Sequence, residues 1–188
     1  QCLSCHSSWA EYALAFNAGQ LNGHGTKGEG PNQLVRLSQE GYIRRVAKDD
    51  RTLPPLDTAA AAKEVALVDP SDPELPLDKR ARSYLHANCA HCHRFGGGGG
   101  QVVLEMDVTR PLKEMGIHDV PPKQGDFGIP NARLVAPGDP TRSVMLYRMA
   151  KFGRGRMPHL GSEWPDPDGL SLLNDWIASL GPAPASPP

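Results

Sequence analysis

Apolar residues recur at helical spacing most clearly near the end of the chain. Between residues 170 and 180 they lie three or four positions apart and so share one face of a helix; they are Leu170, Leu173, Trp176, Ile177 and Leu180. Acidic residues at 166 and 168 suit its first turn, and Gly181 with Pro182 stops it. The pattern predicts a final helix over about 166–180.

Two further helices are predicted in the second half. Residues 78–90 form a helical stretch in which Ala81 and Leu85 share a face. Residues 139–141, with the sequence Asp-Pro-Thr, open another helix that runs to about residue 151. Its candidates for burial are Val144, Leu146 and Tyr147.

The first half has a less regular pattern. Apolar positions over 9–21 predict one helix, and Pro31 introduces a short helix with Leu34 and Leu37 on one side. The proline-rich stretch of about 54–77 is predicted to be a strap, with a short helix over 59–62 inside it.

These patterns predict a mainly α fold with long loops, built from two small halves. The first half is residues 1–77 including the strap, the second is a helical domain over 78–181, and a proline-rich tail covers 182–188.

Composition suggests that side chains alone supply a modest core. The chain has 188 residues, of which 39% are hydrophobic, with 20 Gly and 19 Pro. A chain so rich in turn-forming residues usually needs a further source of stability inside the fold, beyond the packing of its side chains. The net charge of −1 gives no electrostatic case for binding nucleic acid. No apolar run approaches the length of a transmembrane helix.

The four cysteines form two pairs with identical spacing. Cys2 and Cys5 are followed at once by His6, and Cys89 and Cys92 by His93. Cys-x-x-Cys-His is the attachment signature of c-type haem: two thiols bond one haem, and the adjacent imidazole reaches the iron. The sequence therefore predicts two covalently attached haems, with His6 and His93 as proximal ligands.

Two other uses of the cysteines fit less well. A single zinc ion could take two Cys-x-x-Cys pairs, but here the pairs stand 87 positions apart, and zinc gives no reason for a histidine after each. A thioredoxin-like redox pair belongs in a βαβ context, and the sequence shows none.

The sixth ligand of the second haem is predicted to be Met157. It stands in Arg156-Met157-Pro158, 64 positions after His93 and just before the final helix. A thioether on the iron favours the ferrous state and raises the reduction potential. His159 is the main rival.

The first haem has a less definite sixth ligand. His24, flanked by glycines that let the backbone approach a flat cofactor, is a candidate for bis-His ligation. Ligands could also reach across from the second half: Met106, Met115, Met145, Met149 and His118. An upstream segment or an open position would also fit. His86 and His91 are expected at the surface or the haem edge.

A basic stretch precedes Met157. Within it, Arg154 and Arg156 are the candidates for contact with haem propionates. The same charges would form a positive rim that steers an acidic redox partner.

Residues 78–181 resemble a class I cytochrome c. The resemblance rests on the helix with Ala81 and Leu85, the motif ending at His93, Met157 followed by proline, and a final helix with Trp176. It implies that the first and last helices cross and pack together.

Most of the chain is also similar to exported bacterial proteins with paired haem motifs, sometimes fused to dehydrogenase-like propeller domains. That similarity rests on residues 16–22, 32–34, 80–93 and 131–140. Phe95 departs from it, because that family has proline two residues after the motif histidine. The resemblance implies a redox protein, an upstream dehydrogenase or a membrane complex as partner.

The expected function is electron transfer outside the cytoplasm, in the periplasm or the extracellular space, by a carrier rather than an enzyme. Since haem attachment normally follows export, we expect a processed chain or a piece of a longer one. One alternative is a di-haem peroxidase-like enzyme with one open haem. Another is a haem subunit of a membrane-associated redox complex.

Overall fold

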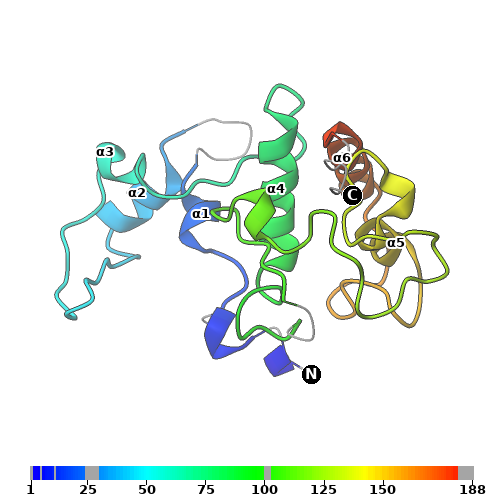
Figure 1. Cartoon of the computed structure of the whole chain (residues 1–188). Coiled ribbons are helices and arrows are strands. Elements are labelled where there is room, and N and C mark those ends of the chain that lie inside the picture. Colours follow the sequence, from blue (N-terminus) through cyan, green and yellow to red (C-terminus); the bar gives the residue numbers. More distant parts are fainter. Residues whose placement is uncertain (1, 5, 11, 24–29, 100–102, 182–188) are drawn as a thin grey trace. The chain divides into compact units, whose positions relative to one another are not determined.

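The computed structural model describes residues 2–4, 6–10, 12–23, 30–99 and 103–181. The fold is mainly helical, with 35% helix and 4% strand, as predicted. Extended pairing in the described part consists of isolated bridges, such as those of His118 with Val135 and Arg133 with Ser143. Figure 1 shows the course of the chain.

The chain divides into two compact units. One contains residues 1–12 together with 69–188, and the other contains residues 13–68. The division predicted from the sequence lies at 77/78. The structure instead groups the first Cys-x-x-Cys-His motif with the unit that carries the second.

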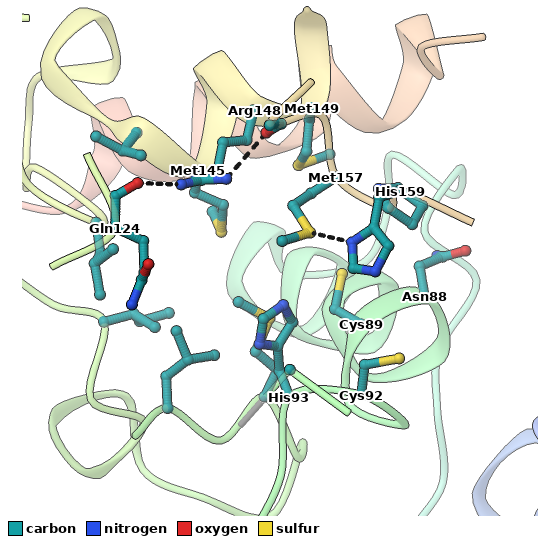
Figure 2. Close-up of a pocket in the computed structure, with 18 of the residues that line it drawn as sticks. Asn88, Cys89, Cys92, His93, Gln124, Met145, Arg148, Met149, Met157 and His159 are labelled. Carbon is teal, nitrogen blue, oxygen red and sulfur yellow. Dashed lines mark hydrogen bonds between the residues drawn. The ribbon is translucent and has the colours of Figure 1, made fainter. Parts of the chain in front are cut away.

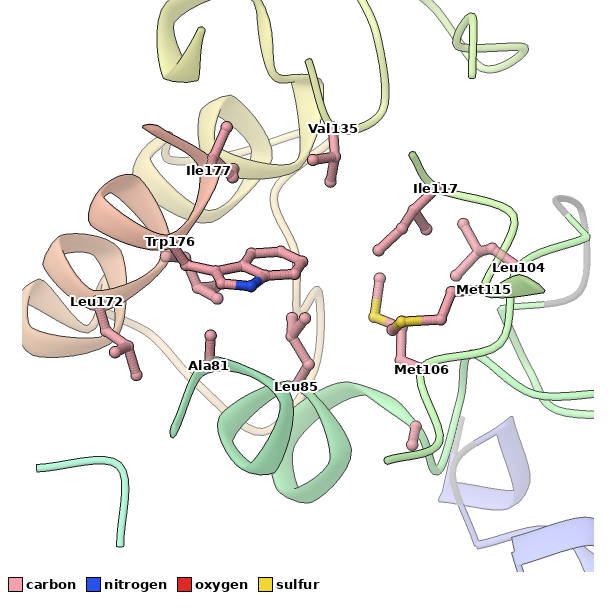
Figure 3. Packing of buried hydrophobic residues seen from close by; sticks show 12 residues of the cluster. Ala81, Leu85, Leu104, Met106, Met115, Ile117, Val135, Leu172, Trp176 and Ile177 are labelled. Atoms are coloured by element: carbon pink, nitrogen blue, oxygen red, sulfur yellow. The ribbon is translucent and has the colours of Figure 1, made fainter. Parts of the chain in front are cut away.

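The larger unit is built around helices α4 (Leu77–Cys89), α5 (Val144–Ala150) and α6 (Pro167–Ser179). Helix α4 packs on α6, and Trp176 is fully buried among apolar neighbours from both helices (Figure 3). The indole Nε1 donates a hydrogen bond to Asp78 Oδ1 at 3.0 Å. The predicted contact between the first and last helices of this half is confirmed.

Helices α4 and α6 are in close contact at Gly169. A Cβ added there would lie 2.2 Å from the hydroxyl oxygen of Tyr84, so only glycine fits. Asp166 caps α6 by accepting from the backbone N–H groups of Asp168 and Gly169 at 3.1 Å. It also accepts a hydrogen bond from the Tyr84 hydroxyl at 2.9 Å, which ties the cap to α4.

The helix predicted over 139–151 is divided. A 3₁₀ turn, η5 (Pro140–Arg142), precedes α5, and Ser143 between them has extended backbone. Val144 is buried as predicted, whereas Tyr147 is 40% exposed. A further 3₁₀ turn, η4, spans Leu112–Glu114.

The single helix predicted over 9–21 is wrong. The structure has short 3₁₀ turns at η1 (Cys2–Ser4) and η2 (Ser8–Ala10), and then the one-turn helix α1 (Ala18–Leu21). Tyr12 and Phe16 have φ of 61° and 60°, a left-handed conformation that interrupts a right-handed helix.

The smaller unit contains α1, α2 (Gln33–Gln39) and α3 (Thr58–Ala61), the last two where short helices were predicted. Its apolar cluster includes Leu34, Leu56 and Ala61. The buried Asn22 side chain donates to the carbonyl of Ala61 at 2.9 Å and accepts from Asn32 at 2.9 Å. These hydrogen bonds of Asn22 join the segments that surround the small core of this unit.

Candidate cofactor site

A cavity of about 610 Å³ lies in the larger unit beside the second cysteine motif. This volume falls within the range of small-molecule and cofactor sites. Its wall is formed by the end of α4, one face of α5 and the loop before α6, as Figure 2 shows. Apolar side chains from the core, including Leu104, Ile117 and Val135, complete it.

The motif turns back on itself at the end of α4. The backbone N–H groups of Cys92 and His93 donate to the carbonyl of Cys89 at 3.1 and 2.8 Å, so both cysteines and the histidine line the cavity. Burial raises the pKa of the Cys89 thiol to about 12, which shows how apolar its surroundings are.

His93 presents a neutral imidazole. Burial lowers its pKa, and the charges of His91, His159 and Arg148 lower it further. A neutral ring keeps a lone pair for a metal. Its buried Nδ1 has no hydrogen-bond partner among the described residues.

Gly99 lets the loop after the motif close over this ring. A Cβ at Gly99 would lie 2.7 Å from His93 Nδ1, too close for any side chain. The Gly99 N–H donates to the Cys92 carbonyl at 3.0 Å, which holds the loop there.

Met157 and its predicted rival His159 both line the cavity, and Figure 2 draws them above His93. Their side chains touch, with His159 Nδ1 3.4 Å from Met157 Sδ. The backbone N–H of Met157 donates to the Arg148 carbonyl at 2.9 Å, which ties the loop to the end of α5.

The arginines of the basic stretch before Met157 have different roles. Arg154 lines the cavity. Arg148 donates to the carbonyls of Gln124 and Gly155 at 2.7 and 3.0 Å and stacks 4.6 Å over the Phe127 ring.

Arg156 is buried, and its guanidinium holds its own loop. It donates to the carbonyls of Pro158, Ser162 and Trp164 and to the Ser162 hydroxyl. Its Nε has no hydrogen-bond partner among the described residues. The structure therefore shows Arg156 bracing the segment that carries Met157.

The methionines offered as distant ligands of the first haem lie around the second motif instead. Met145 and Met149, one turn apart on α5, line the cavity, and Met106 and Met115 belong to the buried core. In the sequence, the spacing of four between Met145 and Met149 along a predicted helix was the signal that the two share a face.

The first and second motifs share one backbone hydrogen bond among the described residues. The His6 N–H donates to the Cys2 carbonyl at 2.9 Å, as His93 does to Cys89. His6 Nδ1 lies 2.6 Å from the Tyr12 carbonyl, the contact expected to orient a ligating imidazole. Cys5 and the candidate ligand His24 lie outside the described residues.

Sequence reasoning treated His86 and His91 alike, and the structure separates them. His86 Nδ1 accepts the Val108 N–H at 3.2 Å and lies 3.7 Å from an Asp107 oxygen. His91 lines the cavity, and its buried Nδ1 has no partner among the described residues. Burial lowers the pKa of His91, and the nearby His6 lowers it further.

Comparison with protein-family models, curated proteins and solved structures found no match. Within the described residues, no three His, Cys, Asp or Glu side chains gather where they could hold a metal ion. None of the helices in the described ranges has both the length and the apolar character of a bilayer-spanning segment.

Proposed function

We propose that this chain is a c-type cytochrome that carries two covalently attached haems and transfers electrons outside the cytoplasm. One observation carries the proposal: Met157, which stands 64 positions after His93, lines the same largely apolar cavity of about 610 Å³ as Cys89, Cys92 and His93. A His/Met-ligated haem c needs two thiols for covalent attachment, and a neutral imidazole and a thioether to ligate the iron.

The residues of the cavity fit such a group. Cys89 and Cys92 would bind it covalently, His93 and Met157 would ligate the iron, and the Gly99 approach keeps the His93 ring in place. When bound, the haem supplies the one-electron chemistry between ferrous and ferric iron. Arg154, which lines the cavity, is the candidate for charge contact with a propionate.

The protein's own contribution is to set the potential and to limit access. The apolar wall disfavours the extra positive charge of ferric iron, and the Met157 thioether acts in the same direction. Arg148 donates to the Gly155 carbonyl and Arg156 to the Pro158 carbonyl, so the loop is held on both sides of Met157. A partner of this site would be another redox protein, a dehydrogenase or a membrane complex.

The test is expression in a host with haem c maturation, followed by mass spectrometry of the denatured chain. The expected mass exceeds that of the polypeptide by two haems, and by one in the double variant Cys89→Ala, Cys92→Ala. An unmodified chain, or one that holds zinc, would refute the proposal.

Absorption spectra assign the ligand and separate transfer from catalysis. The weak far-red band of Met-ligated ferric haem should be lost in Met157→Ala and retained in His159→Ala and Met149→Ala. Loss of the band in one of the other variants would move the ligand assignment. A wild-type haem that is high-spin and reacts with peroxide would favour the peroxidase-like alternative.

A further inference from the structure

The Met157 sulfur has a polar contact in the wall of the cavity. His159 Nδ1 lies 3.4 Å from Met157 Sδ, and Figure 2 draws this contact as a dashed line. A thioether carries no hydrogen on its sulfur, so the sulfur can only accept, and the contact is a hydrogen bond when Nδ1 holds the proton. The sulfur has two lone pairs, and a bond to iron uses one of them. The second lone pair stays available to the imidazole.

The backbone that joins the two side chains is held on both sides. Pro158 lies between them, and its carbonyl accepts from the buried Arg156 guanidinium at 3.1 Å. The Met157 N–H donates to the Arg148 carbonyl at 2.9 Å. His159 is exposed, so water competes for its ring nitrogens. A braced backbone lowers the entropy that is lost when the ring is held against the sulfur.

The two other histidines that line the cavity differ from His159. Nδ1 of His91 and Nδ1 of His93 are buried without a hydrogen-bond partner among the described residues, whereas the His159 ring meets the sulfur. The sequence offered His159 as a rival of Met157 for the iron. The contact between the two side chains gives the histidine a different role, in which it touches the ligand instead of the metal.

We infer that His159 is a positioning residue of the second haem, and that its Nδ1–H donates to the Met157 sulfur while this sulfur ligates the iron. The inference rests on the proposed function and deepens it. Hydrogen bonds to a ligand orient it and change how much electron density it gives to the metal. A donor draws density from the sulfur, so ferric iron is disfavoured and the reduction potential of this haem is raised.

The experiment uses the full chain with both haems attached and compares His159→Ala, His159→Asn and His159→Gln. In asparagine the amide nitrogen is bonded to Cγ, as Nδ1 is in histidine, whereas in glutamine it stands one bond further along the side chain. Asparagine can therefore replace the donor, and glutamine cannot. None of the three new side chains carries a charge, so an effect of charge would be the same in all three variants.

We expect the far-red band of the Met-ligated ferric haem in all three variants, because the sulfur remains the ligand. The midpoint potential of this haem should fall in His159→Ala and His159→Gln and stay at the wild-type value in His159→Asn. His86→Gln is the matched control, and its potential should equal that of the wild type. The His86 ring accepts the Val108 N–H and is not among the described residues that line the cavity.

An unchanged potential in His159→Ala overturns the inference. An equal fall in all three variants overturns it too, because it indicates the loss of a charge and not of a hydrogen bond. Loss of the far-red band in His159→Ala has the same consequence, since the histidine would then be the ligand itself. Failure of the proposed function is distinguishable from these results, because it is shown by a wild-type mass with fewer than two haems.

Discussion

Removing the Arg156 side chain should loosen the loop that carries Met157. The guanidinium is buried and donates to three carbonyls and one hydroxyl between Pro158 and Trp164. In Arg156→Ala these four acceptors lose their charged donor, and the exposed surroundings of Ser162 and Trp164 let water replace part of it.

The cost can be bounded from these contacts. Each lost hydrogen bond is worth roughly 1 kcal/mol when water can compensate in part. Arg156 also buries an Nε without a partner among the described residues, and removing it returns about 1–2 kcal/mol. We therefore expect Arg156→Ala to lower the free energy of unfolding by about 2 kcal/mol.

The assay is urea denaturation of the haem-loaded protein, followed by both tryptophan fluorescence and the far-red band. The band should disappear at lower urea than the fluorescence change, because the loop opens before the core. Arg156→Lys should be intermediate, since lysine keeps the charge and loses the planar fork of donors.

Arg36→Ala is the matched control. The Arg36 side chain is 57% exposed and forms a surface ion pair with Glu40 at 3.7 Å, so its loss should leave the midpoint unchanged. If Arg156→Ala shows the midpoint and far-red band of the wild type, the bracing role of Arg156 is refuted.

Three other perturbations follow from the packing and the charges. Gly169→Ala should destabilise the protein by about 1–3 kcal/mol in denaturant titrations, because its Cβ would collide with the Tyr84 hydroxyl; a neutral effect would contradict the close crossing. Gly99→Ala should lower the haem content per chain measured by pyridine haemochrome, since its Cβ would displace the His93 ring. Burial lowers the pKa of His86 below 6.5, so its stabilisation is complete above that pH and is lost on acidification. Between pH 7 and 5, the free energy of unfolding should fall less steeply in His86→Gln than in the wild type. An identical slope in both would contradict this role of His86.

The helices of the larger unit were predictable because their signals are local. The cap at Asp166 and the apolar spacing through Ile177 lie within the helix they define, and the structure places α6 at Pro167–Ser179. The contact of α6 with α4 came from a resemblance, since no local pattern names the partner of an apolar face.

The prediction of one helix over 9–21 failed because it rested on apolar positions alone, which do not fix where a helix starts. Tyr12 and Phe16 are four apart, yet both have positive φ. Asn17 and Gln20 form a capping box, with reciprocal hydrogen bonds of 2.9 and 3.2 Å, which starts a new helix at Ala18. That box was present in the sequence and indicated the later start.

The candidate site, too, was predictable from the sequence only in part. The two Cys-x-x-Cys-His motifs are local and needed no structure to recognise. The role of Arg156 was not predictable, because a run of basic residues does not reveal which guanidinium turns inward. The isolation of the His91 ring depends on what packs around it, which only the fold supplies.

The hydrogen bond between Trp176 and Asp78 joins residues 98 positions apart. Closing a chain loop of that length costs about 4 kcal/mol of configurational entropy, on top of a constant for the first contact. The described residues that line the cavity, from Tyr84 to Leu160, all lie between Asp78 and Trp176 in the sequence. During synthesis, α4 cannot pack on α6 until α6 has left the ribosome. A chain truncated just before Pro167 should therefore have an accessible cysteine motif and no formed cavity.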